Sequence, residues 1–169
     1  MKINVRDYQA SDFEVCRSLW GELAQHHAET YEDPTIAGSD PGRGFDRYIE
    51  NPRRQGAWVA EVKGQVVGIA GLLVHSREEG EIEPLIVSLP YRNMGIGSML
   101  VRHVVEEAKK MGIRFLSIRP VARNEKALVL FVRLGFNVVG HIDLFQDLSP
   151  LSGRKWKPGL TIHGHELRY

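Results

Sequence analysis

The sequence predicts a mixed α/β fold that forms a single domain over residues 1–169. Short runs with apolar or alternating side chains are typical of strands. Four other segments carry apolar residues at every third or fourth position, which is typical of helices with one buried face. In chain order these signals give βααβββαβαββ, and a chain of this length is large enough to bury one hydrophobic core.

The first part of the chain is predicted to contain a strand and two helices. Residues 1–8 alternate apolar and polar side chains, as a half-buried strand does. Ser11–Glu14 has the spacing of a capping box, so we expect a first helix to start there and to end near residue 28. Tyr31–Gly44 is rich in Gly, Pro and Asp and predicts an irregular loop. Phe45–Glu50 predicts a short amphipathic helix.

The middle of the chain is predicted to form three strands and a long helix. Ala57–Val62 and Val66–Val74 are separated by Lys63-Gly64, a pattern typical of a β-hairpin. Glu81–Val87 predicts a third strand. Ser98–Met111 has apolar residues on one face and charged residues on the other, which predicts an amphipathic helix.

The last part of the chain is predicted to add a strand, a helix and two further strands. The strand is expected at Phe115–Ile118 and the helix at Glu125–Leu134. Gly135 is placed to end this helix in a left-handed cap. Val138–Gln146 and Leu160–Tyr169 are predicted as the final strands.

Composition excludes several classes of protein. The 22 Lys and Arg residues against 21 Asp and Glu residues give a net charge of +1, without the basic surplus of a dedicated nucleic-acid-binding protein. No apolar run approaches the roughly 20 residues of a membrane span, and residues 1–8 do not have the pattern of a secretory signal. The single cysteine, Cys16, cannot form an intrachain disulfide. We therefore expect a cytoplasmic protein with neither a nucleic acid nor a membrane as its partner.

A glycine-containing turn between a strand and a helix is the most informative segment. In the run from Leu85 to Ser98, Gly95 and Gly97 allow the backbone to approach a ligand closely. The first amides of the following helix lack intrahelical partners, and such a terminus binds anions, phosphates above all. Position 100 is leucine, so the three-glycine dinucleotide fingerprint is absent, and no Gly-Lys-Ser/Thr forms a P-loop. The turn predicts a phosphate site of another kind.

Two motifs in this region resemble those of a known family. Arg92–Gly97 matches Q/R-x-x-G-x-G/A, the acetyl-CoA signature of the GNAT superfamily of N-acetyltransferases. Asn124–Ala127 and Leu130–Phe136 then match the family pattern N-x-x-A-x-x-hydrophobic-aromatic-x-x-x-G-F. The resemblance implies a mostly antiparallel central sheet of about seven strands with one splayed strand pair, flanked by about four helices. Pro84 suits a splayed segment because it removes an amide from its strand.

The resemblance also implies acetyl-CoA as a cosubstrate and indicates which residues hold it. The strand before the glycine turn would pair through its backbone with the peptide-like pantetheine arm. The amides of the turn would hold the pyrophosphate, assisted by the helix dipole. The residues expected to bind the cofactor are Leu85, Ile86, Val87, Arg92, Asn93, Met94, Gly95, Ile96, Gly97, Ser98, Asn124 and Phe131.

Two glutamates are the candidate catalytic residues. Glu81 and Glu83 lie two apart on a predicted strand and so project from the same face. The resemblance implies a glutamate on this strand as general base, often acting through a water. Counting from the glycine turn puts Glu81 at the family's position, and Glu83 lies nearer the expected opening. The alternative is that both are ordinary solvated glutamates, since a carboxylate of pKa about 4.3 needs burial or a water relay for this task.

The histidines give weaker signals. His75 and His141 are further candidates, because an unperturbed imidazole is poised near neutrality, with a position at a strand end as the simpler interpretation. No metal site is expected, because two histidine pairs have no cysteine or carboxylate at ligand spacing. These pairs are His26-His27 and His163-Gly164-His165.

One departure from the family pattern leaves two functions open. Phe131 stands where many members have a tyrosine that protonates the departing thiolate, and a phenylalanine ring there is expected to pack. Tyr91, Tyr31 or a water would have to substitute. The first hypothesis is an N-acetyltransferase that acts on a primary amine by direct attack in a ternary complex. The second is a noncatalytic acyl-CoA-binding module.

The acceptor amine is not identified by the sequence. The resemblance implies that the first helix, the loop after it and the C-terminal strands form its site. This part of the chain carries an acidic surplus that would attract a cationic amine, whether of a small molecule or of a peptide. Its acidic residues are Glu29, Glu32, Asp33, Asp40 and Asp46. Because family members often form homodimers, a homodimer stands beside a monomer as an open alternative.

Overall fold

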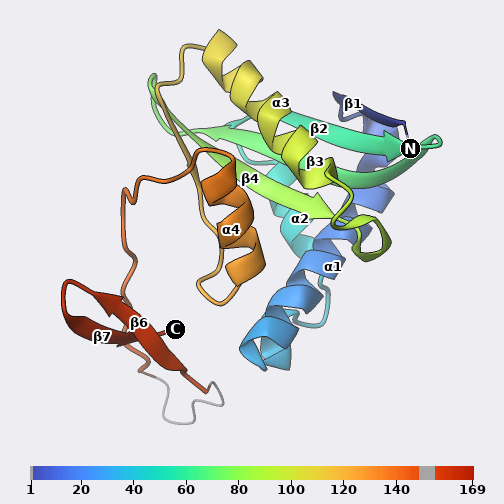
Figure 1. The fold of residues 1–169 in the computed structure, drawn as a ribbon. Coiled ribbons are helices and arrows are strands. Elements are labelled where there is room, and N and C mark those ends of the chain that lie inside the picture. Colours follow the sequence, from blue (N-terminus) through green and yellow to red (C-terminus); the bar gives the residue numbers. More distant parts are fainter. Residues whose placement is uncertain (1, 149–154) are drawn as a thin grey trace.

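The computed structural model describes residues 2–148 and 155–169 and contains a five-stranded sheet (Figure 1). Its strand order is β1-β2-β3-β4-β5, antiparallel except for the parallel pair β4–β5. The strands are β1 Ile3–Asp7, β2 Arg54–Val62, β3 Gln65–Val74, β4 Glu79–Val87 and β5 Phe115–Ile118. The predicted mixed, mostly antiparallel sheet is confirmed.

Four α-helices in the described residues cover the two faces of this sheet. They are α1 Phe13–Tyr31, α2 Arg43–Ile49, α3 Ile96–Lys110 and α4 Glu125–Arg133. Buried residues of α1 and α2 form one hydrophobic cluster with the strands, and buried residues of α3 and α4 form the other. The sheet is therefore the middle of three layers, as Figure 1 shows.

The α1–α2 face is held by aromatic side chains. Phe45 of α2 is fully buried, and its ring centroid lies 5.6 to 6.2 Å from those of Phe13, Trp20 and Tyr48. Packing of this kind fixes α2 against α1, since aromatic pairs at such distances contribute about 0.5 to 1.5 kcal/mol beyond burial. The short helix α2 is therefore held in place by its buried residues.

A β-bulge in β4 interrupts the regular register with β3. Ala70 pairs with Leu85 and Leu72 pairs with Ile82, so Glu83 and Pro84 together face the single residue Gly71. A Cβ atom at Gly71 would lie 1.8 Å from Tyr48 Oη and 2.5 Å from the carbonyl oxygen of Glu83. The bulge therefore requires glycine at this point of β3.

The C-terminal region differs from its prediction. Val138–Gln146 is not a strand, and the predicted strand Leu160–Tyr169 is instead part of a hairpin of β6 Pro158–Ile162 and β7 His165–Arg168. The turn at His163-Gly164, where both residues have positive φ, divides the two strands. The described residues thus contain seven strands, five in the sheet and two in a hairpin that lies apart from it (Figure 1).

The start of α1 also differs from its prediction. The helix begins at Phe13 with Asp12 as N-cap, and not in the capping box expected from Ser11–Glu14. The Asp12 carboxylate accepts the backbone amide of Gln9 at 2.8 Å and a bidentate pair of bonds from Arg6. A buried carboxylate bound in this way fixes the chain before the helix, so the serine is not needed there.

Gly71→Ala is expected to destabilise the fold by about 1 to 3 kcal/mol, because the added methyl group overlaps the Tyr48 hydroxyl and the Glu83 carbonyl. Urea unfolding measures this change. Gly140→Ala is the matched control, since nothing lies within 4 Å of a Cβ there. Adding Tyr48→Phe should recover only part of the loss, because the overlap with the carbonyl remains. An unchanged free energy of unfolding in Gly71→Ala would contradict the proposed packing.

Candidate functional site

The site begins where β4 and β5 separate. Their parallel pairing runs from Glu79–Phe115 to Ile82–Ile118, where β5 ends. β4 continues to Val87, and Leu85, Ile86 and Val87 pair with β3 only. Among the described residues no strand pairs with the other edge of this segment. This fork, formed by Glu83–Val87 and the end of β5, leaves backbone amides and carbonyls for a peptide-like ligand.

The turn after β4 is fixed by side chains from α1 and from the turn itself. Glu22 of α1 accepts hydrogen bonds from Ser88 Oγ at 2.9 Å and from the amide of Leu89 at 3.0 Å. Arg92 Nε donates to the carbonyl oxygen of Val87 at 2.9 Å. The first residue of the glycine motif therefore holds the end of β4 in place, a role that the motif pattern does not reveal.

The glycine turn ends in a helix N-terminus without a side-chain cap. Asn93 and Gly95 have φ values of 61° and 82°, in the left-handed region, and Gly95 is the N-cap of α3. By helix geometry the amides of Ile96, Gly97 and Ser98 have no intrahelical acceptor. Unpaired amides at the positive end of a 15-residue helix suit an anionic group such as a pyrophosphate.

Gly97 lies between this turn and the neighbouring elements. A Cβ atom there would lie 3.7 Å from Leu130 Cδ2 of α4 and 3.8 Å from Val87 Cγ2 of β4. These are ordinary contact distances, so the fold alone does not require glycine at position 97. A larger side chain at position 97 would extend from the edge of the predicted pyrophosphate site toward the fork.

Asn124 and Phe131 lie on α4 and both have structural roles. Asn124 is the N-cap of the helix, and its Oδ1 accepts the amide of Ala127 at 3.1 Å. Phe131 is buried in the α3–α4 core, where its ring packs edge-on against Phe136 with centroids 6.4 Å apart. The packing role expected for Phe131 is in agreement with this position.

The two candidate glutamates face the same side of the sheet but have different surroundings. Ile82 between them packs in the α3–α4 core, so Glu81 and Glu83 face the α1–α2 side. Glu81 is buried, and its carboxylate lies 2.9 Å from His75 Nε2 and 3.4 Å from Arg119 Nε. Glu83 is exposed and stands one residue beyond the last β4–β5 pair.

The pKa of the Glu83 carboxyl is raised above its ordinary value. Partial desolvation by the surrounding protein is the main cause, and the negative charge of Glu81 adds to it, while Arg119 and His75 oppose it. A carboxylate of raised pKa is a stronger base than an ordinary one. Of the two candidates, Glu83 therefore combines the position and the basicity that proton abstraction needs.

Arg53 and Arg119 belong to this cluster and were not predicted. Arg53 Nη1 lies 3.4 Å from His75 Nδ1, so the cluster joins the loop before β2, the turn before β4 and the residue after β5. Of the cluster formed by Arg53, His75, Glu81 and Arg119, only Glu81 and His75 were singled out from the sequence, because carboxylates and imidazoles are the usual acid–base groups. No local pattern marks the arginines, since their contacts come from the pairing of distant segments.

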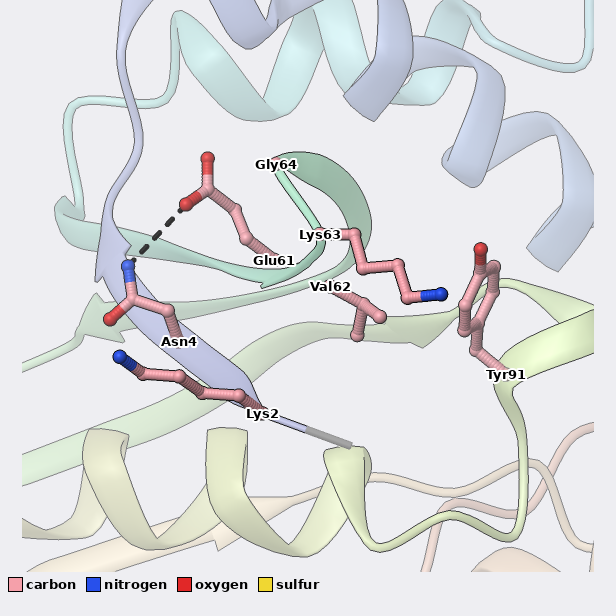
Figure 2. Close-up of a pocket in the computed structure, with 7 residues that line it drawn as sticks. All are labelled: Lys2, Asn4, Glu61, Val62, Lys63, Gly64 and Tyr91. Atoms are coloured by element: carbon pink, nitrogen blue, oxygen red, sulfur yellow. Dashed lines mark hydrogen bonds between the residues drawn. The ribbon is translucent and has the colours of Figure 1, made fainter.

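The two candidate tyrosines lie away from the described contacts of Glu83. Figure 2 shows Tyr91 at an open pocket of about 750 Å³, with the Lys63 side chain extending toward it. Its hydroxyl lies 3.5 Å from Gln65 Oε1 at the start of β3. The Tyr31 ring lies under the Arg123 guanidinium, 4.6 Å from its carbon. Neither hydroxyl has a described contact with Glu83.

The acidic loop after α1 is largely paired within the chain. Arg17 binds both Asp40 and Asp46, and Lys157 beside β6 binds Glu32 at 2.7 Å. These ion pairs reduce the expected attraction of the loop for a cationic amine. They also tie α2 and the C-terminal hairpin to α1, on the side of the sheet that Glu83 faces.

In residues 2–148 and 155–169, no group of three or more His, Cys, Asp or Glu side chains gathers in a way that would hold a metal ion. None of the helices in this part of the chain has the length and apolarity to cross a bilayer.

Comparison with known proteins agrees with this geometry. Residues 18–136 match the model of the Acetyltransferase (GNAT) family. An uncharacterized N-acetyltransferase of Methanocaldococcus jannaschii is 30% identical over 114 residues, which are 56% of this chain and 50% of the relative. The chain spans about half the length of the curated relatives it matches.

Solved structures show the same fold at low sequence identity. A GNAT-family acetyltransferase of Staphylococcus aureus Mu50 superposes with a TM-score of 0.67 at 19% identity, over 90% of this chain and 96% of that one. AAC(6')-Iy, solved with the bisubstrate analogue CoA-S-monomethyl-acetylneamine, gives 0.63 at 14% identity, over 88% and 100%. Since the family model covers most of the sequence and the fork and glycine turn lie where its motifs place them, the chain belongs to the GNAT family of acetyltransferases.

Proposed function

We propose that this acyltransferase moves an acetyl group from acetyl-CoA to a primary amine by direct attack within a ternary complex. The observation that carries the proposal is the position of Glu83, a carboxylate of raised pKa at the fork between β4 and β5. The structural neighbour AAC(6')-Iy was solved with an analogue that joins CoA to an amine-bearing acceptor, which supports this class of reaction.

The fork and the glycine turn suit the two halves of CoA. The open edge of Leu85–Val87 offers amides and carbonyls to the amide groups of the pantetheine arm, as an added strand would receive them. The uncapped N-terminus of α3 offers unpaired amides to the pyrophosphate. Since these contacts are mostly main chain, side chains in the turn are free to vary. When bound, acetyl-CoA supplies the thioester carbonyl that the amine attacks.

The amine must lose a proton, and Glu83 is placed to take it. An amine of pKa about 10.4 is neutral in roughly one molecule in 2,000 at pH 7, which costs about 4 to 5 kcal/mol. Glu83 accepts the proton directly or through one water. Its raised pKa reduces the difference between its own pKa and that of the amine. Glu81 is held by His75 and Arg119 and is less available for this step.

The departing thiol needs less assistance than the amine. Phe131 has no proton to donate and lies in the core, and the described contacts of Tyr91 and Tyr31 are with Gln65 and Arg123. A thiol of pKa about 8.5, by analogy with cysteine, leaves as a thiolate at a cost of only about 2 kcal/mol relative to protonation at pH 7. Solvent water therefore suffices as the proton source in this proposal.

An amine panel tests the function directly. The protein with acetyl-CoA is offered polyamines, aminoglycosides, amino sugars and peptide amines, and free thiol release is measured. We expect turnover on at least one class, with initial-rate lines that intersect because both substrates bind before reaction. Tight CoA binding with no turnover on any amine would instead support the noncatalytic acyl-CoA-binding module.

Glu83→Gln is expected to lower kcat by about 10² to 10⁴, because the amide cannot accept the proton. The wild-type rate should fall as pH drops through the raised pKa of Glu83, since protonation removes the base, and this acid limb should disappear in the variant. The pH dependence of kcat/KM is the measurement. Glu79→Gln, an exposed position on the same strand, is the matched control. An acid limb that survives in Glu83→Gln would place the base elsewhere.

Gly97→Glu is expected to weaken acetyl-CoA binding at least about tenfold, or about 1.4 kcal/mol, by adding bulk and negative charge beside the pyrophosphate site. Gly97→Ala should fold normally and bind more tightly than the glutamate variant, because its Cβ meets neighbours at ordinary distances. Calorimetric titration with acetyl-CoA measures both. Equal affinities in wild type and Gly97→Glu would show that the turn does not hold the cofactor.

A further inference from the structure

A buried carboxylate stands directly behind the base. The Glu81 side chain is only 5% exposed, and Oε2 and Oε1 lie 2.9 Å from His75 Nε2 and 3.4 Å from Arg119 Nε. Removing an ionised carboxylate from water is costly unless it is paired and hydrogen-bonded. His75 and Arg119 supply that pairing, so Glu81 is held in one orientation at the root of the fork.

The partner of the second histidine nitrogen fixes the position of the histidine proton. Arg53 Nη1 lies 3.4 Å from His75 Nδ1. A guanidinium can only donate hydrogen bonds, so Nδ1 must be the acceptor. The proton of the neutral ring then lies on Nε2, from which it is donated to Glu81. Arg53, His75 and Glu81 thus form a hydrogen-bond network in which every donor and acceptor has one assigned role.

Backbone hydrogen bonds hold this Arg53–His75–Glu81 network in place. The amide of Val74 donates to the carbonyl oxygen of Arg53 at 2.8 Å, and the amide of His75 donates to that of Glu79 at 2.9 Å. These bonds fix the loop before β2 and the turn before β4 against the sheet. The charges that act on Glu83 are those of Glu81 and Arg119, together with that of His75 when its ring is protonated, and the buried hydroxyl of Tyr48 lies on the same side.

We propose that Arg53 and His75 are positioning residues that hold Glu81 as a fixed anion behind Glu83, and that this anion keeps Glu83 a strong enough base. The proposal rests on the proposed function, in which Glu83 takes the proton from the amine. Glu81 itself need not touch the substrate. Its charge disfavours a second negative charge two residues away, so it favours the protonated form of Glu83.

The sign of the effect follows from this repulsion. Glu81 raises the pKa of Glu83, so Glu81→Gln should move the titration of Glu83 to lower pH. The glutamine keeps an oxygen that can accept from His75 Nε2, so the geometry is preserved while the charge is lost. The acid limb of kcat/KM should move to lower pH in the same direction.

Nuclear magnetic resonance of the free protein tests the Arg53–His75–Glu81 network without any substrate. Nitrogen-15 spectra of the histidines should show His75 with its proton on Nε2. Carbon-13 titration of the glutamate carboxyls should show Glu83 titrating at lower pH in Glu81→Gln than in wild type. A proton on Nδ1 of His75, or an unchanged Glu83 titration in Glu81→Gln, would overturn the proposal.

Variants of His75 separate positioning from simple packing. His75→Leu should lower kcat about tenfold to hundredfold, as misplacement of reacting groups does, with the KM for acetyl-CoA nearly unchanged. His75→Gln, which still has a donor, should recover most of the loss. His103→Leu, on α3 beyond the residues assigned to the glycine turn, is the matched control. Equal rates in His75→Leu and His103→Leu, or no recovery in His75→Gln, would show that the donor has no such role.

The two proposals fail in distinguishable ways. If no amine is acetylated by wild type, the proposed function fails. The tautomer of His75 and the titration of Glu83 still decide whether the hydrogen-bond network exists. If an amine is acetylated and the acid limb belongs to Glu83, but Glu81→Gln leaves that limb at the same pH, only the proposed role of the hydrogen-bond network fails.

Discussion

The site depends on the residue at which the β4–β5 ladder stops. Four residue pairs join the two strands, and the bulge of Glu83 and Pro84 follows the last of them. Backbone groups on an unpaired strand edge bond to water or to an added chain, so the open edge of Leu85–Val87 can receive a peptide-like ligand. The same bulge needs the missing Cβ of Gly71, behind which Tyr48 of the α1–α2 core is packed. Core packing and ligand edge are therefore parts of one arrangement, and a change on the helical side reaches the site through the strand between them.

A second constraint comes from burial of charge. Glu81 and Glu83 have the same chemistry and face the same side, but only Glu81 lies in the paired part of β4, where it is buried. A buried carboxylate must have partners, and these come from the turn before β4 and the residue after β5. Pairing makes Glu81 a fixed charge, while the next glutamate, past the end of the ladder, remains accessible to substrate. In the mechanism proposed above, one strand supplies both the base, Glu83, and the charge that adjusts its strength.

Short-range patterns predicted most of the fold, and contacts between distant segments explain what they missed. The strand Phe115–Ile118, the helix from Glu125 and the glycine turn each have a local signal in periodicity or in motif spacing. The apolar run Val138–Gln146 also has such a signal, yet the described structure forms no strand there, because a strand needs a neighbour and the run pairs with none. The contacts of His75 with Arg53 and Glu81 join two loops and a strand, so no window of sequence contains them. The glutamates were found because two carboxylates precede the motif, but the difference in their burial depends on register.

Phenylalanine at position 131 is compatible with catalysis because the two proton transfers differ in cost. At pH 7 an amine of pKa about 10.4 is some three units from its reactive form, or roughly 4 to 5 kcal/mol, while a thiol of pKa about 8.5 lies only about 1.5 units, or roughly 2 kcal/mol, from its thiolate. The larger demand therefore falls on the base. Packed against Phe136 in the core, Phe131 contributes to the position of α4, whose Leu130 borders the glycine turn. In the proposed mechanism, the carboxylate at the fork acts on the larger barrier, and the absence of a proton donor at position 131 affects only the smaller one.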